Sequence, residues 1–189
     1  MRVIAGTAKG RRLKGPSDRS GRVRPSSDLV RGAMFDALAS MGVSMSRVLD
    51  LYAGSGALGI EALSRGASWC DFVERDRAAC ASIRDNLRLT GFEERADVLC
   101  VPAERALDRL QGEYTLVLAD PPYADSGALA VLQSLAQSGL LVDDAVLVLE
   151  HSARPDGPYG AEPPSALGRL TLLNSRRHGD SAVSIYRRR

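Results

Sequence analysis

Short apolar runs alternate with amphipathic stretches along most of the chain. The apolar runs have the length and composition of buried strands, and they are expected near residues 47–51, 69–73, 96–101, 114–119 and 145–150. Segments with apolar residues on one helical face lie between them, near residues 57–65, 76–90, 103–110 and 127–138. Strands that alternate with helices in this way predict a parallel sheet covered by helices.

The two ends of the chain depart from this alternation. A helix with one apolar face is expected near residues 28–41, and residues 2–5 and 12–14 read as the strands of a small hairpin. Residues 167–176 and 182–186 predict a closing antiparallel hairpin. We therefore expect a Rossmann-like α/β fold, with a seven-stranded and mostly parallel sheet, a C-terminal antiparallel hairpin and a small N-terminal β-hairpin extension.

Basic residues gather at the start of the chain. Residues 1–31 carry nine Lys and Arg against two Asp, a net charge of +7 in a protein whose total is only +2. Such polarity is typical of proteins that bind nucleic acid, although a solvated basic tail has the same composition. We divide the chain into a basic arm at residues 1–27 and a catalytic domain at residues 28–189. The candidate nucleic-acid-binding residues are Arg2, Lys9, Arg11, Arg12, Lys14, Arg19, Arg22 and Arg24.

A short motif follows the fourth apolar run. Asp120-Pro121-Pro122-Tyr123 places a carboxylate, a carbonyl and an aromatic ring at the expected carboxyl end of a buried strand. Two acceptors beside a flat ring suit a planar substrate that carries an amino group. The plainer interpretation is a proline-rich turn with a capping Asp.

A glycine-rich turn follows the first apolar run. Gly54, Gly56 and Gly59 allow a tight turn and a close approach of the backbone to a ligand. Glu74 ends the second run, where an acid can accept hydrogen bonds from both hydroxyls of a ribose. This spacing also satisfies the dinucleotide fingerprint. Asp50, however, lies just before the glycines, and an acid there suits a cationic amino-acid end better than a pyrophosphate.

The motifs together resemble a known family. Residues 50–56 and 120–123 are similar to those of class I methyltransferases that modify the exocyclic amines of bases. The N-terminal pattern Arg2-Val3-Ile4-Ala5-Gly6, then Gly10-Arg11-Arg12-Leu13, then residues 24–35, resembles the bacterial 16S rRNA guanine-N(2) methyltransferases that act on guanine 966. The resemblance spans nearly the whole chain and implies S-adenosylmethionine as cofactor.

The resemblance also implies roles for individual residues. Asp120, Pro121, Pro122 and Tyr123 are the expected catalytic residues, with Asp120 and the Pro121 carbonyl holding the amine and Tyr123 stacking on the base. Pro102 replaces an acid of the family pattern, so only backbone around Ala103 is expected near adenine. The expected cofactor-binding residues are Asp50, Tyr52, Ala53, Gly54, Ser55, Gly56, Glu74, Arg75, Ala103 and Asp120.

Three other functions remain open from the sequence. An adenine-N(6) methyltransferase uses the same motif after the fourth strand, a NAD-dependent oxidoreductase uses the same glycine spacing, and an RNA-binding module without activity keeps the same fold. The intact motif at residues 120–123 makes the last one the least expected.

Composition narrows the setting of the protein. The 189 residues suffice for one domain with a full core, and Cys70, Cys80 and Cys100 have neither the pairing of a disulfide framework nor the spacing of a zinc site. No apolar run reaches about 18 residues, the length that a membrane helix needs. We expect a cytoplasmic monomer without metal or membrane contact, whose partner is 16S rRNA in a small-subunit particle or assembly intermediate.

Overall fold

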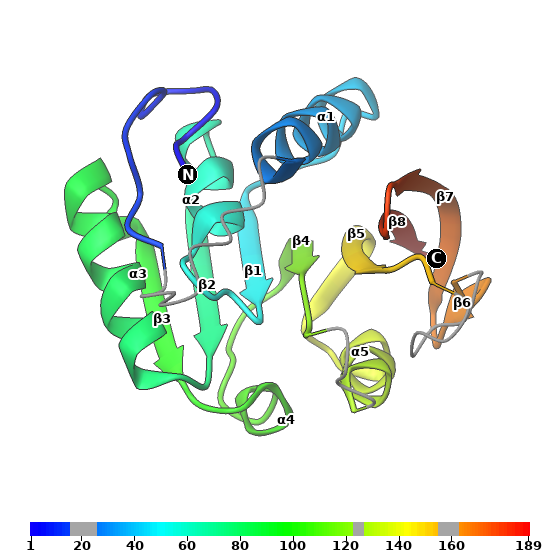
Figure 1. The fold of residues 1–189 in the computed structure, drawn as a ribbon. Helices are drawn as coiled ribbons and strands as arrows, with labels where there is room; N and C mark the ends of the chain where they lie inside the picture. The colour runs from blue at the N-terminus through cyan, green and yellow to red at the C-terminus, as the bar shows by residue number, and fades with distance from the viewer. Residues whose placement is uncertain (16–25, 123–126, 155–162) are drawn as a thin grey trace.

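A single mixed sheet forms the centre of the protein. The structure is a computed structural model that describes residues 1–15, 26–122, 127–154 and 163–189. Within these ranges eight strands pair in the order β3-β2-β1-β4-β5-β8-β7-β6 (Figure 1). The strands are β1 (Arg47–Leu51), β2 (Trp69–Glu74), β3 (Ala96–Cys100), β4 (Tyr114–Ala119), β5 (Leu141–Ser152), β6 (Ala166–Leu167), β7 (Leu170–His178) and β8 (Ser181–Arg188). The first five run parallel, and β8, β7 and β6 follow as antiparallel neighbours.

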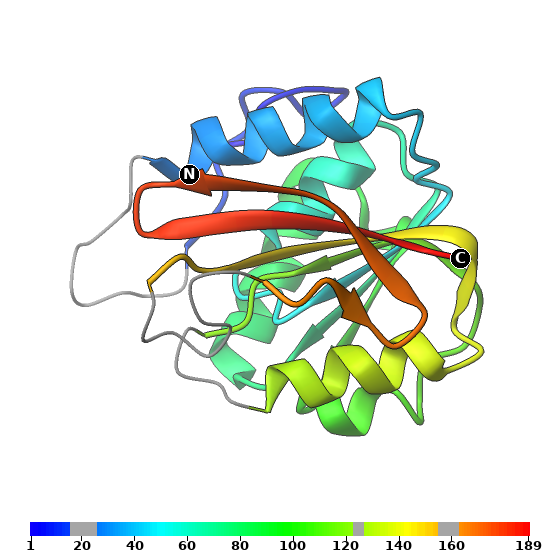
Figure 2. The ribbon, with the colours of Figure 1, turned by 90° about the vertical axis from the view of Figure 1, so that its right-hand side faces the viewer.

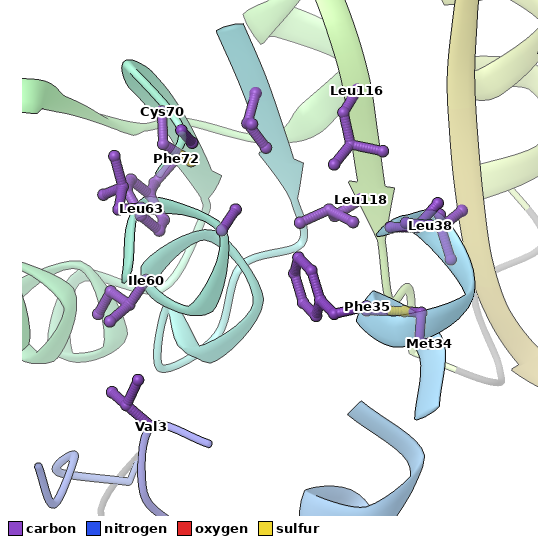
Figure 3. Packing of buried hydrophobic residues seen from close by; sticks show 14 of the residues in the cluster. Val3, Met34, Phe35, Leu38, Ile60, Leu63, Cys70, Phe72, Leu116 and Leu118 are labelled. Atoms are coloured by element: carbon purple, nitrogen blue, oxygen red, sulfur yellow. The ribbon is translucent and has the colours of Figure 1, made fainter. Parts of the chain in front are cut away.

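Helices cover both faces of the sheet (Figures 1 and 2). They are α1 (Ser26–Ser40), α2 (Ala57–Ser64), α3 (Arg77–Thr90), α4 (Ala103–Ala106) and α5 (Ala128–Gln137), with a 3₁₀ turn at Glu93–Arg95. Residues of α1, α2 and α3 share one apolar cluster with alternate residues of β1, β2 and β4, whereas α4 and α5 pack on the other face. Figure 3 shows Phe35 and Leu38 of α1 pointing toward Leu118. Burial on both faces explains why the parallel strands are almost continuously apolar.

Most of the predicted elements are confirmed, whereas the number of strands, the length of α4 and the N-terminal hairpin differ from the prediction. The expected seven strands are wrong, because the sheet has eight in the part of the chain that the structure describes. Gly168, with a φ of 56°, turns the chain inside the segment expected as one strand, so that Leu167 of β6 pairs with Leu170 of β7. Helix α4 is also shorter than expected and ends at Ala106.

Residues 1–15 pack against the helices instead of extending from them. Val3, Ala8 and Leu13 are buried in the cluster beneath α2 and α3, and Figure 3 shows Val3 beside Ile60. The expected hairpin is reduced to one antiparallel bridge, between Arg2 and Arg12. This segment therefore shares the core of the sheet domain.

A buried carboxylate ties this segment to α2. Glu61, which is fully buried, accepts hydrogen bonds from the backbone N–H groups of Ile4 (2.8 Å) and Ala5 (3.0 Å). Gly6 follows with a φ of 81°, and a Cβ there would lie 1.8 Å from the carbonyl oxygen of Ser64. Glycine is required at this point because the backbone is left-handed and presses on the end of α2.

Candidate active site

The carboxyl ends of β1, β2, β4 and β5 meet at one edge of the sheet and border a cavity of about 580 Å³. This volume lies within the range of about 300–1,000 Å³ for small-molecule sites. The cavity brings together eight residues that the sequence predicts, namely Tyr52, Gly54, Glu74, Arg75, Ala103, Asp120, Pro121 and Pro122. Ligands of open α/β sheets bind at this edge, so the cavity is the candidate active site.

The turn after β1 has a tightly constrained backbone. Tyr52 has a φ of 59°, and Gly54 and Gly56 have φ values of 55° and 76°. A positive φ at a bulky residue such as Tyr52 is uncommon and clusters at functional sites. The N–H of Ala53 is bound to the Val73 carbonyl at 3.0 Å, which holds the turn against β2.

The third glycine of the pattern has a packing role. A Cβ at Gly59 would lie 2.4 Å from the Phe72 ring and 2.7 Å from the Cys70 sulfur. Glycine therefore lets α2 approach β2 closely, as the dinucleotide fingerprint requires of its last glycine. The glycine turn therefore has the geometry of the dinucleotide fingerprint as well as its residue spacing. Its backbone is compatible with both a nicotinamide dinucleotide and S-adenosylmethionine.

Glu74 is fixed against the glycine turn that follows β1. Its Oε2 accepts a hydrogen bond from the Gly54 N–H at 2.9 Å, and its Oε1 accepts one from the Asp76 N–H at 2.8 Å. Asp76 in turn caps α3 by accepting from the Ala79 N–H. The carboxylate of Glu74 is therefore oriented by two backbone donors before any ligand binds.

Asp50 lies under the cavity lining and is only 1% exposed. Its Oδ2 accepts a hydrogen bond from the Gly59 N–H at 2.9 Å. Burial raises the pKa of Asp50 well above its ordinary value, the Gly59 hydrogen bond opposes this, and the negative charges of Asp120 and Glu74 raise it further. Its predicted contact with the cofactor's amino end stays a prediction, since Asp50 is not among the residues that line the cavity.

Asp120 follows β4, which lies between β1 and β5. Ala119 pairs with Leu149, so Asp120 and Glu150 are the next residues along two neighbouring strands, and both line the cavity. Pro121 and Pro122 lead the chain away along the cavity wall. Tyr123 lies outside the residues that the structure describes, so its predicted stacking role stays a prediction.

The cavity lining is strongly acidic. Its described charged residues are four carboxylates and one guanidinium, namely Glu74, Glu104, Asp120, Glu150 and Arg75. Such a lining repels a pyrophosphate and attracts a cation. S-adenosylmethionine, with its sulfonium and ammonium groups, fits these residues, whereas a nicotinamide dinucleotide fits them poorly.

Comparison with known proteins agrees with this geometry. Residues 1–187 match the family described as Conserved hypothetical protein 95. The chain belongs to this family. It is 35% identical over 192 residues to YlbH of Bacillus subtilis, whose name describes a candidate rRNA methyltransferase, and the match covers 100% of both chains.

Two Escherichia coli proteins support the same relationship. Ribosomal RNA small subunit methyltransferase D is 35% identical over 150 residues, which cover 79% of this chain and 74% of that protein. The solved structure of yhhF, described as a candidate methyltransferase, has a TM-score of 0.84 and 30% identity, and covers 100% of this chain and 97% of its own. The predicted α/β methyltransferase fold is confirmed.

Three predicted cofactor-binding residues, Ala53, Ser55 and Gly56, lie in the glycine turn after β1 but do not line the cavity. The Ser55 carbonyl accepts a hydrogen bond from Asn86 at 3.0 Å, and the same amide group of Asn86 donates to the Lys14 carbonyl at 2.9 Å. The turn is thereby connected to the N-terminal segment through α3.

Part of the cavity lining is not predicted by the sequence. Val73, Val101, Pro102, Glu104 and Glu150 also border the cavity. Glu150 had a usable signal, because it is the only acid in the second half of the fifth apolar run and stands where Asp120 stands after the fourth. Its meaning depends on the pairing of β4 with β5, which the sequence does not reveal.

The predicted RNA-binding residues divide into two groups. Arg2, Lys9, Arg11, Arg12 and Lys14 are exposed on the N-terminal segment, and Lys14 forms an ion pair with Asp85 at 2.8 Å. Arg19, Arg22 and Arg24 lie outside the described residues. RNA binding by both groups stays a prediction.

No helix in the described ranges is long and apolar enough to cross a bilayer. Over the same ranges, the side chains do not form a group of three His, Cys, Asp or Glu residues that could hold a metal ion. Cys80 is fully buried. Burial, more than neighbouring groups, raises the pKa of its thiol to about 12, and the thiol donates a hydrogen bond to the Glu74 carbonyl.

Proposed function

We propose that this protein transfers a methyl group from S-adenosylmethionine to the exocyclic N(2) amine of a guanine in 16S rRNA. The observation that carries the proposal is the acidic cavity in which Asp120, Pro121 and Pro122 end β4 beside the glycine turn. Family membership and the rRNA methyltransferase names of relatives support an rRNA substrate.

The cofactor would be held by residues on three strand ends. Glu74 would accept hydrogen bonds from the ribose hydroxyls of the cofactor. The turn at Gly54 would lie close to its methionine moiety, and the backbone at Ala103 would border its adenine. When bound, S-adenosylmethionine supplies a methyl group on a positively charged sulfur. The surrounding carboxylates favour that charge and exclude anionic ligands.

The base would be held by Asp120 and the Pro121 carbonyl. A guanine amine is a weak nucleophile because its lone pair is delocalised into the ring. Hydrogen bonds from the amine to these two acceptors favour a more nucleophilic nitrogen and stabilise the positive charge that develops on it. Placing the amine in line and excluding water would supply the rest of the rate enhancement.

Glu150 favours guanine over adenine in this proposal. Guanine offers two neighbouring donors, N1–H and the N2 amine, whereas adenine has an acceptor at N1. A second carboxylate beside Asp120 provides acceptors for the guanine pattern and repels the adenine N1 lone pair. A site that hydrogen-bonds a substrate donor rejects analogues that lack it, because its own polar groups are then left unpaired.

The target base would have to leave its stack to reach this cavity, as bases do in other base-modifying enzymes. The substrate would therefore be an exposed guanine of 16S rRNA, alone or in a small-subunit particle or assembly intermediate. The reaction would take place in the cytoplasm, where that RNA is assembled.

The test is nucleoside mass spectrometry of 16S rRNA incubated with the protein and isotopically labelled S-adenosylmethionine. We expect labelled N(2)-methylguanosine, and no label with Asp120→Ala. Labelled N(6)-methyladenosine would replace the guanine assignment by the adenine one. Absence of label together with a nicotinamide-dependent absorbance change would support an oxidoreductase.

A further inference from the structure

The turn of the β7–β8 hairpin lies at the same edge of the sheet as the cavity. Ser181, the first residue of β8, pairs with Ser152 at the end of β5, and the Ala153 N–H donates to the Asp180 carbonyl at 2.9 Å. Figure 2 shows this turn beside the start of α1. The two strands of the hairpin therefore bring the residues of its turn next to the active-site edge.

Arg176 stands in the same row of the sheet as the cavity residue Glu150. Glu150 pairs with Val183 of β8, and Val183 pairs with Arg176 of β7. Two strand spacings separate their backbones, which is about 10 Å. Residues in one row project to the same face, and Arg176 indeed lines a shallow groove with Val30 and Met34 of α1.

The cations of this hairpin end are available to a partner. Arg176 is exposed and forms no ion pair or side-chain hydrogen bond with the described residues. Its neighbour Arg177 is also exposed and uses only its Nε, which donates to the Gly179 carbonyl at 2.9 Å. Arg176 and Arg177 are consecutive in β7 and project to opposite faces of the sheet. Each therefore offers its own exposed guanidinium group, which is suited to binding phosphate oxygens with two hydrogen bonds.

The charge of the cavity decides where phosphates can lie. Glu104, Asp120 and Glu150 admit a neutral base but repel the phosphates that flank it. The RNA backbone must therefore stay outside the cavity, held by cations at its rim. On the β5 side, the described basic residues at this end of the sheet include Arg154, which is paired with Asp180 at 2.6 Å, and the two arginines at the end of β7.

We propose that the β7–β8 hairpin end, with Arg176 and Arg177, is an RNA-binding surface that contacts the phosphates beside the target base. The N-terminal segment, which packs on α2 and α3, lies on the other side of the glycine turn. The RNA would then be gripped on both sides of the cavity. The inference rests on the proposed function, because it takes the substrate to be RNA.

The test compares Arg176→Gln and the double variant R176Q/R177Q with Arg169→Gln. Arg169 is an exposed arginine in the β6–β7 turn, at the opposite end of β7, so it controls for loss of charge alone. Affinity for a 16S rRNA fragment is measured by filter binding over a series of KCl concentrations. Each phosphate contact contributes about 0.7 to the slope of log affinity against log salt.

We expect the slope to flatten by about 0.7 in R176Q and about 1.4 in the double variant, with no change in R169Q. Affinity for S-adenosylmethionine and the thermal midpoint should stay unchanged in all three. If the double variant unfolds at lower temperature, R177E replaces it, because reversal of that exposed charge should weaken RNA binding without repacking the α1 groove.

An unchanged slope in the folded variants would overturn the inference, and so would equal flattening in R169Q. An effect seen only with assembled particles would assign the cations to a protein neighbour and overturn it as well. The proposed function is tested separately by the methylated nucleoside that the wild-type protein forms. Formation of N(2)-methylguanosine with an unchanged slope would leave that function standing and remove the hairpin from it.

Discussion

Acidic residues have different surroundings at the two edges of the parallel sheet. Toward the amino edge, Asp71 in the middle of β2 accepts hydrogen bonds from three residues that begin strands: Arg47 (2.9 Å), the Tyr114 hydroxyl (2.6 Å) and the Trp69 indole (2.8 Å). At the carboxyl edge, Asp50, Glu74, Asp120 and Glu150 crowd around a cavity or just beneath it. The same strands β1, β2 and β4 build both edges.

The difference separates an acid that stabilises the fold from acids kept for a ligand. Asp71 meets a cation and two neutral donors, so its charge is matched within the protein. At the other edge the pKa of Asp50 is raised, first by burial and further by the negative charges of Asp120 and Glu74. Preorganised charge of one sign costs stability in the free protein and is repaid when a cation binds. Substitutions of acidic residues should therefore reduce activity at the carboxyl edge and stability at the amino edge.

The largest effect is expected for Asp120→Ala. Loss of one preorganised charge-stabilising contact typically reduces the rate by about 100- to 1,000-fold, while S-adenosylmethionine affinity should change little. Single-turnover methyl transfer and calorimetric titration of the donor measure the two quantities. Near-normal turnover would show that Asp120 does not act on the base, and Asp120→Asn tests whether its charge or only its acceptor is needed.

The mirror experiment at the amino edge is Asp71→Ala. It leaves Arg47, Trp69 and Tyr114 without their shared acceptor, so the free energy of unfolding should fall by about 3 kcal/mol. Urea denaturation measures this. Methyl transfer per folded molecule should be unchanged, and a loss of turnover as large as that of Asp120→Ala would abolish the contrast between the edges.

Glu74→Ala sharpens the comparison at the cofactor side. Hydrogen bonds to a charged group are worth roughly 2–3 kcal/mol, so donor affinity measured by calorimetry should fall by that amount. Glu74→Gln keeps one oxygen for the Gly54 N–H and should lose less. Equal affinity of Glu74→Ala and the wild type would remove Glu74 from the cofactor site.

The smallest effect concerns the pH dependence of stability. The pKa of Asp50 is raised in the folded protein, mainly by burial. Its contribution to stability is therefore complete below the unfolded pKa of about 3.9, and is lost as the pH rises through the folded pKa. The free energy of unfolding of the wild type should fall relative to that of Asp50→Asn over this window. A difference between the two proteins that is constant with pH would show that the pKa of Asp50 is the same in the folded and unfolded states.

Local patterns were enough to predict most of the fold and eight of the thirteen residues that line the cavity. The parallel strands and the helices between them follow from apolar runs and helical periodicity, which report burial without reference to distant residues. Asp120 and Glu74 were recognisable because each stands at the end of a predicted strand, and parallel strands end at a common edge. The spacing of the glycines identified Gly59 as part of the fingerprint. A Cβ at this position would lie 2.4 Å from the Phe72 ring, which explains why no larger residue fits.

Long-range pairing decided the rest. Glu150 becomes a cavity residue only because Ala119 pairs with Leu149, and Arg176 comes near it only through the register of β8. The N-terminal segment, predicted as a basic arm, joins the core because Glu61 binds the backbone of Ile4, which is 57 residues away in sequence.

The amino-acid sequence by itself determined where strands and helices form and which side chains stand at strand ends, because hydrophobic period and glycine spacing are local properties. Only the tertiary structure decided which of those side chains share a cavity, and how burial and neighbouring charges change their pKa. These depend on strand register and on the loss of water around each group, and both are set by residues far apart in the chain.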